Sequence, residues 1–360
     1  MDLIILAAGF AVLTAGADVL VRGASGIAGG FGIPPLIVGL TVVAFGTSAP
    51  ELAVSVGAAR TGQADMALGN VIGSNILNIL LILGLSALIA PLRITSQLVR
   101  VDVPLMIGAS LVVLLFALDG GIDRLDGAIL FGALVLYLAM QIQLGRMERQ
   151  SGTREQAMSD SGAGRPHWLR DLVYVAVGLV LLVAGARLLV TSAVAIAQSF
   201  GVSELVIGLT IVAGGTSLPE LATSVIASIR GERDLAVGNV VGSNVFNLLG
   251  VLGLSALLSP AGISVAAEAL RFDLPVMLAV ALACLPIFVT GMQIARWEGA
   301  LFLAYYVAYS LYVVLAAAGH ESLGSYSAAM LGFVVPLTAI TLTILFARYQ
   351  SGSGQAGSQS

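Results

Sequence analysis

The chain has 360 residues, of which 58% are hydrophobic and 10% are charged, and its formal net charge is −4. Soluble domains carry roughly 25% charged residues, so this composition excludes a soluble globular protein. The high apolar content equally excludes a disordered chain. The only cysteine, Cys284, lies in an apolar stretch and is interpreted as a small packing residue. We therefore predict an all-α protein that crosses a membrane many times.

Apolar stretches long enough to cross a bilayer, about 20 residues each, recur along the whole chain. One hydrophilic linker, 146–170, separates two sets of five stretches, and the tail 349–360 has low complexity. We predict ten core spans and an extra eleventh span, at 3–21, 36–58, 66–90, 101–118, 126–144, 171–190, 205–228, 235–258, 273–291, 298–318 and 327–347.

The distribution of arginine predicts the orientation, because cytoplasmic loops are enriched in Arg and Lys. All 16 basic residues are Arg. If the linker 146–170 is cytoplasmic, twelve of them lie inside, while Arg60, Arg124 and Arg271 lie outside and Arg187 lies within a span. The N-terminus is then external.

Residues 36–91 and 205–260 are two copies of one segment, with 34 of 56 positions identical at a constant offset of 169. Weaker similarity on both sides makes the repeat unit five spans long. Because five is odd, the second copy must enter the membrane from the opposite side. Inverted repeats of this kind are typical of secondary transporters, which bind their substrates at the bilayer midplane. The predicted fold is therefore two inverted five-helix repeats plus a C-terminal span.

Each copy carries two polar motifs in the middle of its apolar segments. A repeated scaffold without a site would preserve the apolar pattern, whereas here the polar residues are preserved. The first motif is GTSAPE at 46–51 and GTSLPE at 215–220, and the second is GNVIGSNILN at 69–78 and GNVVGSNVFN at 238–247.

Glu51 and Glu220 lie near the middle of their spans, where a carboxylate is costly and indicates a functional site. Pro50 and Pro219 have no N–H to donate to the preceding turn. Each of these spans is therefore predicted to break, which leaves carbonyls around 44–46 and 213–215 free to face inward. Irregular backbone is tolerated in a bilayer where it lines a cavity.

The motifs together supply carboxylate, hydroxyl, amide and carbonyl oxygens, with no Cys, His or Lys. Residues four apart share a helix face, which predicts that Thr47 lies beside Glu51 and Ser74 beside Asn78. An oxygen-only site suits hard cations such as Ca²⁺, which takes 6–8 oxygen ligands; a pair of Glu would alternatively carry protons. The remaining motif amides are interpreted as packing or capping residues: Asn70, Asn75, Asn239 and Asn244.

With its doubled GTSxPE and GNxxGSNxxN motifs, the sequence resembles the sodium/calcium exchangers of the cation/calcium antiporter superfamily, in particular prokaryotic members. The resemblance covers both repeats and, more weakly, the rest of the first ten spans. It implies an antiporter without enzymatic activity or cofactor, in a prokaryotic cytoplasmic membrane. The first and sixth spans would slide past the core, and no nucleic acid or obligatory protein partner is expected.

The spans, the linker and the internal repeat predict the domain organisation, and the resemblance implies a ligand set. The first repeat is 1–145 with α-repeat 1 at 36–91, and the second is 171–320 with α-repeat 2 at 205–260; the linker, 321–348 and 349–360 complete the chain. Glu51 and Glu220 would coordinate Ca²⁺. The further ligands for Ca²⁺ and Na⁺ would be Thr47, Ser48, Ser74, Asn78, Thr216, Ser217, Ser243, Asn247 and the backbone oxygens of Ala44 and Ala213.

Two departures from the family pattern bear on mechanism. Relatives often carry one Asp at the position of either Asn78 or Asn247, whereas both are Asn here. This site therefore holds two formal negative charges, and its Na⁺ stoichiometry and any K⁺ requirement stay open. The eleventh span is extra to the usual ten. A Ca²⁺/H⁺ exchanger using the same carboxylates is the nearest alternative. A channel and an intramembrane enzyme are more distant ones, and for the enzyme no HExxH or GxSxG motif is present.

Two charged residues outside the motifs are counterparts of each other in the two repeats. Asp18 and Arg187 occupy equivalent positions in the first and sixth spans. Both are interpreted as side chains that extend toward a membrane interface.

Overall fold

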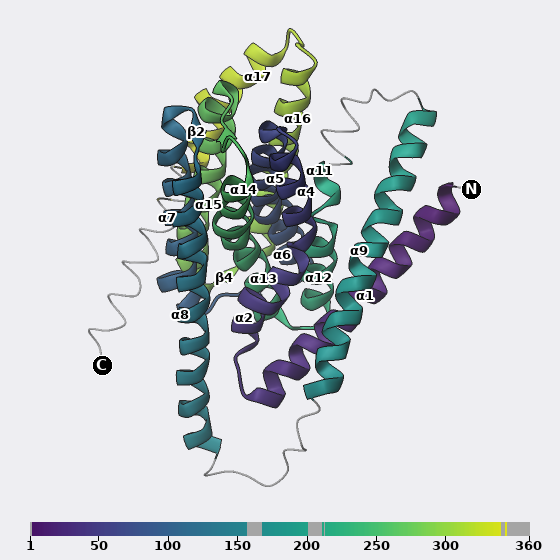
Figure 1. The fold of residues 1–360 in the computed structure, drawn as a ribbon, viewed down its shortest axis with the longest axis vertical. Coiled ribbons are helices and arrows are strands. Elements are labelled where there is room, and N and C mark those ends of the chain that lie inside the picture. Colours follow the sequence, from purple (N-terminus) through teal and green to yellow (C-terminus); the bar gives the residue numbers. More distant parts are fainter. Residues whose placement is uncertain (1, 157–167, 201–210, 212, 340–342, 344–360) are drawn as a thin grey trace.

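The computed structural model describes residues 2–156, 168–200, 211, 213–339 and 343, which are almost entirely helical. Within these described residues, eight single helices are long and apolar enough to cross a membrane, and a bent pair, Pro35–Thr47 with Ala49–Arg60, makes a ninth candidate. Most of the helices pack into one bundle, whereas α1 (Asp2–Phe31) and α9 (Trp168–Ser199) lie together along one side of it (Figure 1).

The first half contains four single spanning helices and the bent one. Short π-helical segments, labelled η, interrupt several of them. The elements are α1 Asp2–Phe31, α2 Pro35–Val38, η1 Gly39–Val43, α3 Ala44–Thr47, α4 Ala49–Arg60, α5 Ala64–Leu77, η2 Asn78–Leu83, α6 Gly84–Ile89, β1 Leu92–Arg93, η3 Leu98–Asp102, α7 Val103–Phe116, the 3-10 turn η4 Ala117–Asp119, β2 Gly121–Ile122 and α8 Arg124–Gln156.

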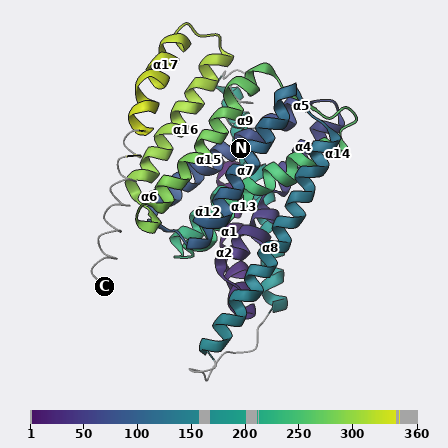
Figure 2. The same cartoon turned by 90° about the vertical axis from the view of Figure 1, so that its left-hand side faces the viewer.

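The second half repeats this order. Its elements are α9 Trp168–Ser199, α11 Ala213–Gly215, α12 Leu218–Ile229, α13 Arg233–Val245, η6 Phe246–Leu252, α14 Gly253–Leu258, β3 Ile263–Ser264, η7 Ala269–Asp273, α15 Leu274–Val289, the 3-10 turn η8 Thr290–Met292, β4 Gln293–Ile294 and α16 Arg296–Ala317. Beyond it lie α17 Leu323–Ala329 and η9 Met330–Val334. Seen from the side, α16 and α17 cover the edge of the bundle away from α1 and α8 (Figure 2).

The two halves are joined by two short antiparallel strand pairs that exchange partners between the repeats. β1 follows α6 and pairs with β4, with Leu92 opposite Ile294, while β2 pairs with β3, with Ile122 opposite Ile263. Because β3 is the repeat counterpart of β1 and β4 that of β2, the exchange is reciprocal. A two-fold relation between the halves produces this reciprocity.

Helices α1 and α9 approach each other closely because glycines face the contact. A Cβ added to Gly16 would lie 2.7 Å from the backbone nitrogen of Leu182, and one added to Gly178 would lie 2.6 Å from that of Leu20. Small residues at such crossings let two membrane helices pack backbone to backbone. These two helices therefore form a tightly packed pair. The apolar cluster at their contact contains Leu13, Leu20 and Leu182 and also takes in bundle residues such as Val38 and Leu235.

Several helices extend beyond the predicted spans. The first helix runs to Phe31, and α8 continues to Gln156, well into the predicted linker 146–170. Residues 157–167 of that linker, 205–210 and 212 of the seventh predicted span, 340–342 and 344–347 of the eleventh and the tail 349–360 lie outside the described residues. The total of ten core spans plus an eleventh therefore stays a prediction.

Candidate cation-binding site

Both predicted helix breaks are present where the sequence places Ser and Pro. Between α3 and α4 the axis bends by 46°. Ser48 at this break has φ −78° and ψ 4°, and Ser217 at the second break has φ −88° and ψ 7°. Pro50 and Pro219 each occupy the second position of the following helix, where a missing N–H costs nothing. The two breaks therefore have the same geometry in both repeats.

The breaks place Glu51 and Glu220 in the first turns of α4 and α12. Both side chains are buried, with exposed fractions of 0% and 1%. Ion pairs among the described residues involve only the carboxylates of Asp18 and Asp171. Neither glutamate therefore has an arginine partner, and the positive ends of the two helix dipoles supply the nearest fixed favourable field.

Each glutamate is bound by the break of the other repeat. Ser217 Oγ donates to Glu51 Oε1 at 2.9 Å, and Ser48 Oγ donates to Glu220 Oε1 at 3.2 Å. Ser74 Oγ lies 3.1 Å from Ser217 Oγ, which adds α5 to the same cluster. The two carboxylates are thus held in one centre by reciprocal contacts between the repeats.

The threonines of the breaks also cross between repeats. Thr47 Oγ1 donates to Asn239 Oδ1 at 3.1 Å, and Thr216 Oγ1 donates to Asn70 Oδ1 at 3.3 Å. The predicted pairing of Thr47 with Glu51 on one helix face is wrong, because the break at Ser48 separates α3 from α4. Spacing of i, i+4 places side chains together only on a continuous helix.

Asn70 and Asn239 have more than a packing role in these contacts. Asn70 Nδ2 donates to the Glu51 carbonyl at 3.3 Å and to Ser55 Oγ at 2.9 Å. Asn239 Nδ2 does the same to the Glu220 carbonyl at 3.4 Å and to Ser224 Oγ at 2.9 Å. They fix the backbone of both glutamates. From the sequence, both are interpreted as packing or capping residues, although their repetition within the motif is a signal that could have indicated this role.

The second motifs place their amides at π-helical segments. Asn78 is the first residue of η2, and Asn247 lies in η6. Short π-helical bulges inside α-helices are frequent at functional sites. Asn78 Nδ2 donates to Asn244 Oδ1 at 3.0 Å, and Asn247 Nδ2 donates to Asn75 Oδ1 at 3.2 Å. Both amides are therefore anchored through their nitrogens to the opposite repeat.

Several buried oxygens of this centre have no hydrogen-bond partner among the described residues. Buried polar atoms are normally satisfied, and unsatisfied acceptors that converge are suited to a cation. No cluster of three His, Cys, Asp or Glu that could hold a metal occurs in the described part of the chain, so a cation here must use hydroxyls and amides besides the two carboxylates. The atoms are Glu51 Oε2, Glu220 Oε2, Asn78 Oδ1, Asn247 Oδ1 and Ser243 Oγ.

One of the two backbone carbonyls expected at the site already accepts a hydrogen bond. The carbonyl of Ala44, predicted to be free, accepts the amide of Ser48 at 3.0 Å, because the chain completes one more helical turn before it breaks. Ala44 packs on α13 next to Ser243: a Cβ added to Gly242 would lie 2.8 Å from the Ala44 side chain. Ala213 is the first residue of α11, at the corresponding place before the second break.

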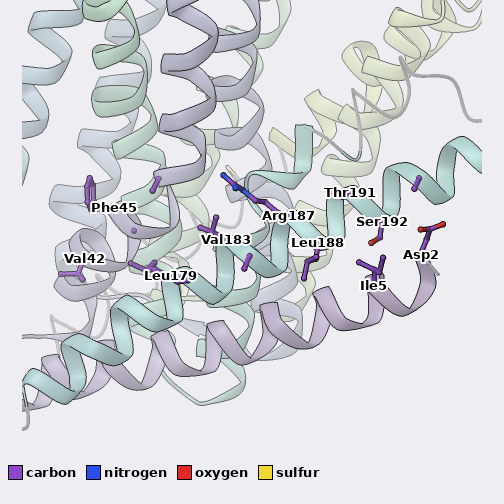
Figure 3. Close-up of a pocket in the computed structure, with 15 residues that line it drawn as sticks. Asp2, Ile5, Val42, Phe45, Leu179, Val183, Arg187, Leu188, Thr191 and Ser192 are labelled. Carbon is purple, nitrogen blue, oxygen red and sulfur yellow. The ribbon is translucent and has the colours of Figure 1, made fainter.

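A cavity of about 1110 Å³ lies between α9 and the first break. Gly46 and Ala49, which flank Thr47 and Ser48, line this cavity, and so does Asp2 at the start of α1. Arg187 extends from α9 into this space (Figure 3). Asp18 pairs with Arg22 and with Arg230 at the end of α12, while its predicted extension toward a membrane interface stays a prediction.

These features define a helical membrane protein with inverted repeats and a buried oxygen-lined centre between them. The profile of the sodium/calcium exchanger protein family matches residues 1–143 and 171–315. The chain belongs to this family.

Individual relatives match over nearly their whole lengths. The chain is 43% identical to the putative antiporter CaxA of Alkalimonas amylolytica, over 84% of this chain and 95% of that one. It is 34% identical to the sodium/calcium exchanger MaX1 of Methanosarcina acetivorans, over 86% and 97%. The solved structure of the sodium-calcium exchanger NCX_Mj superposes with a TM-score of 0.73 at 30% identity, covering 85% of this chain and 96% of that one.

Proposed function

We propose that this cation antiporter exchanges Ca²⁺ for Na⁺ by alternating access, without covalent chemistry. The observation that carries the proposal is the pair of buried carboxylates, each with one oxygen held by a serine of the other repeat and one oxygen unsatisfied. Such a centre needs positive charge, and the described protein residues supply none there. Relatives named as sodium/calcium exchangers support Na⁺ as the coupling ion.

The ligand roles follow from this geometry. Glu51 and Glu220 would neutralise Ca²⁺, and the unsatisfied amide and hydroxyl oxygens would complete its shell. Na⁺, with a single charge, would use the same carboxylates together with hydroxyls at the breaks. The complete proposed ligand set is Glu51, Glu220, Thr47, Ser48, Ser74, Asn78, Thr216, Ser217, Ser243, Asn247 and the carbonyls of Ala44 and Ala213.

Charge balance limits what the site can hold at one time. One Ca²⁺ or two Na⁺ neutralise the charge of −2 on the two carboxylates, whereas three Na⁺ leave a net charge of +1. An excess charge is costly where the effective dielectric constant is low, unless carbonyl, hydroxyl and amide dipoles offset it. The charge count favours two Na⁺ per Ca²⁺, and the family resemblance favours three.

Alternating access would come from movement of α1 and α9 against the bundle. The glycine contacts between these helices join them into one unit, and the cavity beside α9 leads toward the first break. The N-terminus would be external and the linker 146–170 cytoplasmic, in a prokaryotic inner membrane. The two repeats, 1–145 and 171–320, would exchange conformations between the two states.

Transport by the purified protein in liposomes tests the proposal. We expect a Na⁺ gradient alone to drive Ca²⁺ accumulation against its own gradient, and Glu51→Gln liposomes to serve as the inactive control. Accumulation driven by a pH gradient and insensitive to Na⁺ would establish a Ca²⁺/H⁺ exchanger instead. Flux only down the Ca²⁺ gradient would indicate a channel.

A further inference from the structure

The amides of Asn78 and Asn247 pose an orientation problem for a cation site. A primary amide carries an oxygen acceptor at one end and an NH₂ donor at the other, and only the oxygen binds a cation. A rotation of about 180° around the last side-chain bond would turn two N–H groups toward the ion. A ligand amide therefore needs something that fixes which end faces the site.

In the first repeat a backbone carbonyl fixes this orientation. Asn244 Nδ2 donates to the backbone oxygen of Asn75 at 3.3 Å. A carbonyl can only accept, so Asn244 must direct its NH₂ there and its Oδ1 elsewhere. That oxygen receives Asn78 Nδ2 at 3.0 Å. The NH₂ of Asn78 is thereby occupied, and its Oδ1 is left buried without a partner.

The second repeat shows the same contact between amides with the roles exchanged, but there the sulfur of Met277, and not a backbone carbonyl, lies at the NH₂ of the orienting residue Asn75. Asn247 Nδ2 donates to Asn75 Oδ1 at 3.2 Å, and Asn247 Oδ1 is again buried without a partner. Asn75 Nδ2 points at the sulfur of Met277, 3.7 Å away, and Asn244 Nδ2 lies 3.6 Å from the sulfur of Met106. The same relation thus occurs twice, on helices from opposite halves of the chain.

We propose that Asn75 and Asn244 are positioning residues, which hold the amides of Asn247 and Asn78 with their oxygens toward the transported cation. This inference rests on the proposed function, because it assigns the two unsatisfied oxygens to a cation. It replaces the interpretation of Asn75 and Asn244 as plain packing residues. Each repeat then orients the ligand of the other, so the centre is complete only when both halves are docked.

The test uses the chemistry of a carboxylate, which has an oxygen at both ends and needs no orientation. Asn244→Ala removes the acceptor for the Asn78 NH₂. In the parent, we expect it to weaken Ca²⁺ binding to the purified full-length protein by about 10- to 100-fold, the range typical of residues that orient metal ligands. In an Asn78→Asp background, we expect the same change to cost less than about 2-fold.

The second ligand amide provides a matched control. An Asn247→Asp background leaves Asn78 an amide, so Asn244→Ala should there retain its full effect. Asn75→Ala should show the opposite pattern, with its effect removed by Asn247→Asp and retained with Asn78→Asp. This second series also decides the question if Asn244→Ala reduces the yield of folded protein.

The outcomes separate the inference from the proposed function. Equal losses in all three backgrounds, or no loss in the parent, would overturn the positioning role and leave a packing role. A parent protein that binds no Ca²⁺ competitively with Na⁺ would overturn the proposed function itself. Isothermal titration with Ca²⁺ in detergent, with and without Na⁺, measures both, and thermal unfolding of each variant reports its folding.

Discussion

Glu51 and Glu220 bind across the repeats with one oxygen each and leave the other oxygen without a partner. A buried carboxylate without a charged partner does not stabilise the fold, because no ion pair offsets the free energy of its desolvation. A bound cation would offset the desolvation free energy of both carboxylates. Under the proposed function, the residues that destabilise the empty centre are therefore the ones that would bind the cation.

Glu51→Gln or Glu220→Gln should abolish Ca²⁺ transport while the protein stays folded, because each change removes one of two formal charges and keeps the side chain's shape. Na⁺-driven Ca²⁺ uptake and gel filtration measure the two effects. Glu268→Gln, an exposed carboxylate, should transport normally. Near-normal exchange in both site variants would refute the assignment.

Asn247→Asp should raise Ca²⁺ affinity and shift the competition between Na⁺ and Ca²⁺, because it adds a third negative charge at the site. Competition curves on the variant and the parent measure the shift. Gln63→Glu adds the same charge at an exposed position and should change neither affinity. Unchanged curves for Asn247→Asp would mean that its side chain does not face the cation.

At the scale of elements, the α1 and α9 pair depends on the absence of side chains at its crossing. Gly16→Leu should destabilise the protein by about 1–3 kcal/mol through forced separation of the backbones, and slow exchange. Gly29→Leu on the same helix meets open space and should leave stability unchanged or raise it. Thermal unfolding of both variants decides, and equal effects would count against tight packing at Gly16.

Among the described residues, one ion pair joins α1 to the bundle. Asp18 binds Arg230 at the end of α12, while its repeat counterpart Arg187 faces a cavity. We expect Asp18→Asn to cost at most about 1 kcal/mol of stability, since the pair is partly exposed, but to loosen α1. A cysteine at Ser228, which is buried, should then react faster with a thiol reagent. An unchanged reaction rate would show that the ion pair between Asp18 and Arg230 does not hold α1 against α12.

At the scale of the whole molecule, arginine is concentrated on one side of the predicted topology. A reporter fused within the linker 146–170 should therefore be cytoplasmic and one at the N-terminus external. A C-terminal reporter tests the eleventh span separately, with a cytoplasmic signal expected. A linker reporter on the external side would reverse the proposed orientation.

The sequence by itself determined the class of protein, the repeats and the places where two helices break. Composition and apolar length decide the first, since every backbone polar group in a bilayer must be satisfied within helices. Repetition of polar residues revealed the second, and Pro50 and Pro219 fix the third because they lack an N–H. These are local properties, readable without knowing which residues meet.

Only the tertiary structure decided the pairings. Sequence spacing predicted that Thr47 lies beside Glu51. In the structure, Thr47 instead donates a hydrogen bond to Asn239, and Ser217 donates one to Glu51. The fold also separated the amides that present oxygen, such as Asn78, from those that orient them. The physical reason is that these partners stand more than a hundred positions apart in the chain, so they meet only when the two repeats dock, and no helical periodicity encodes that contact.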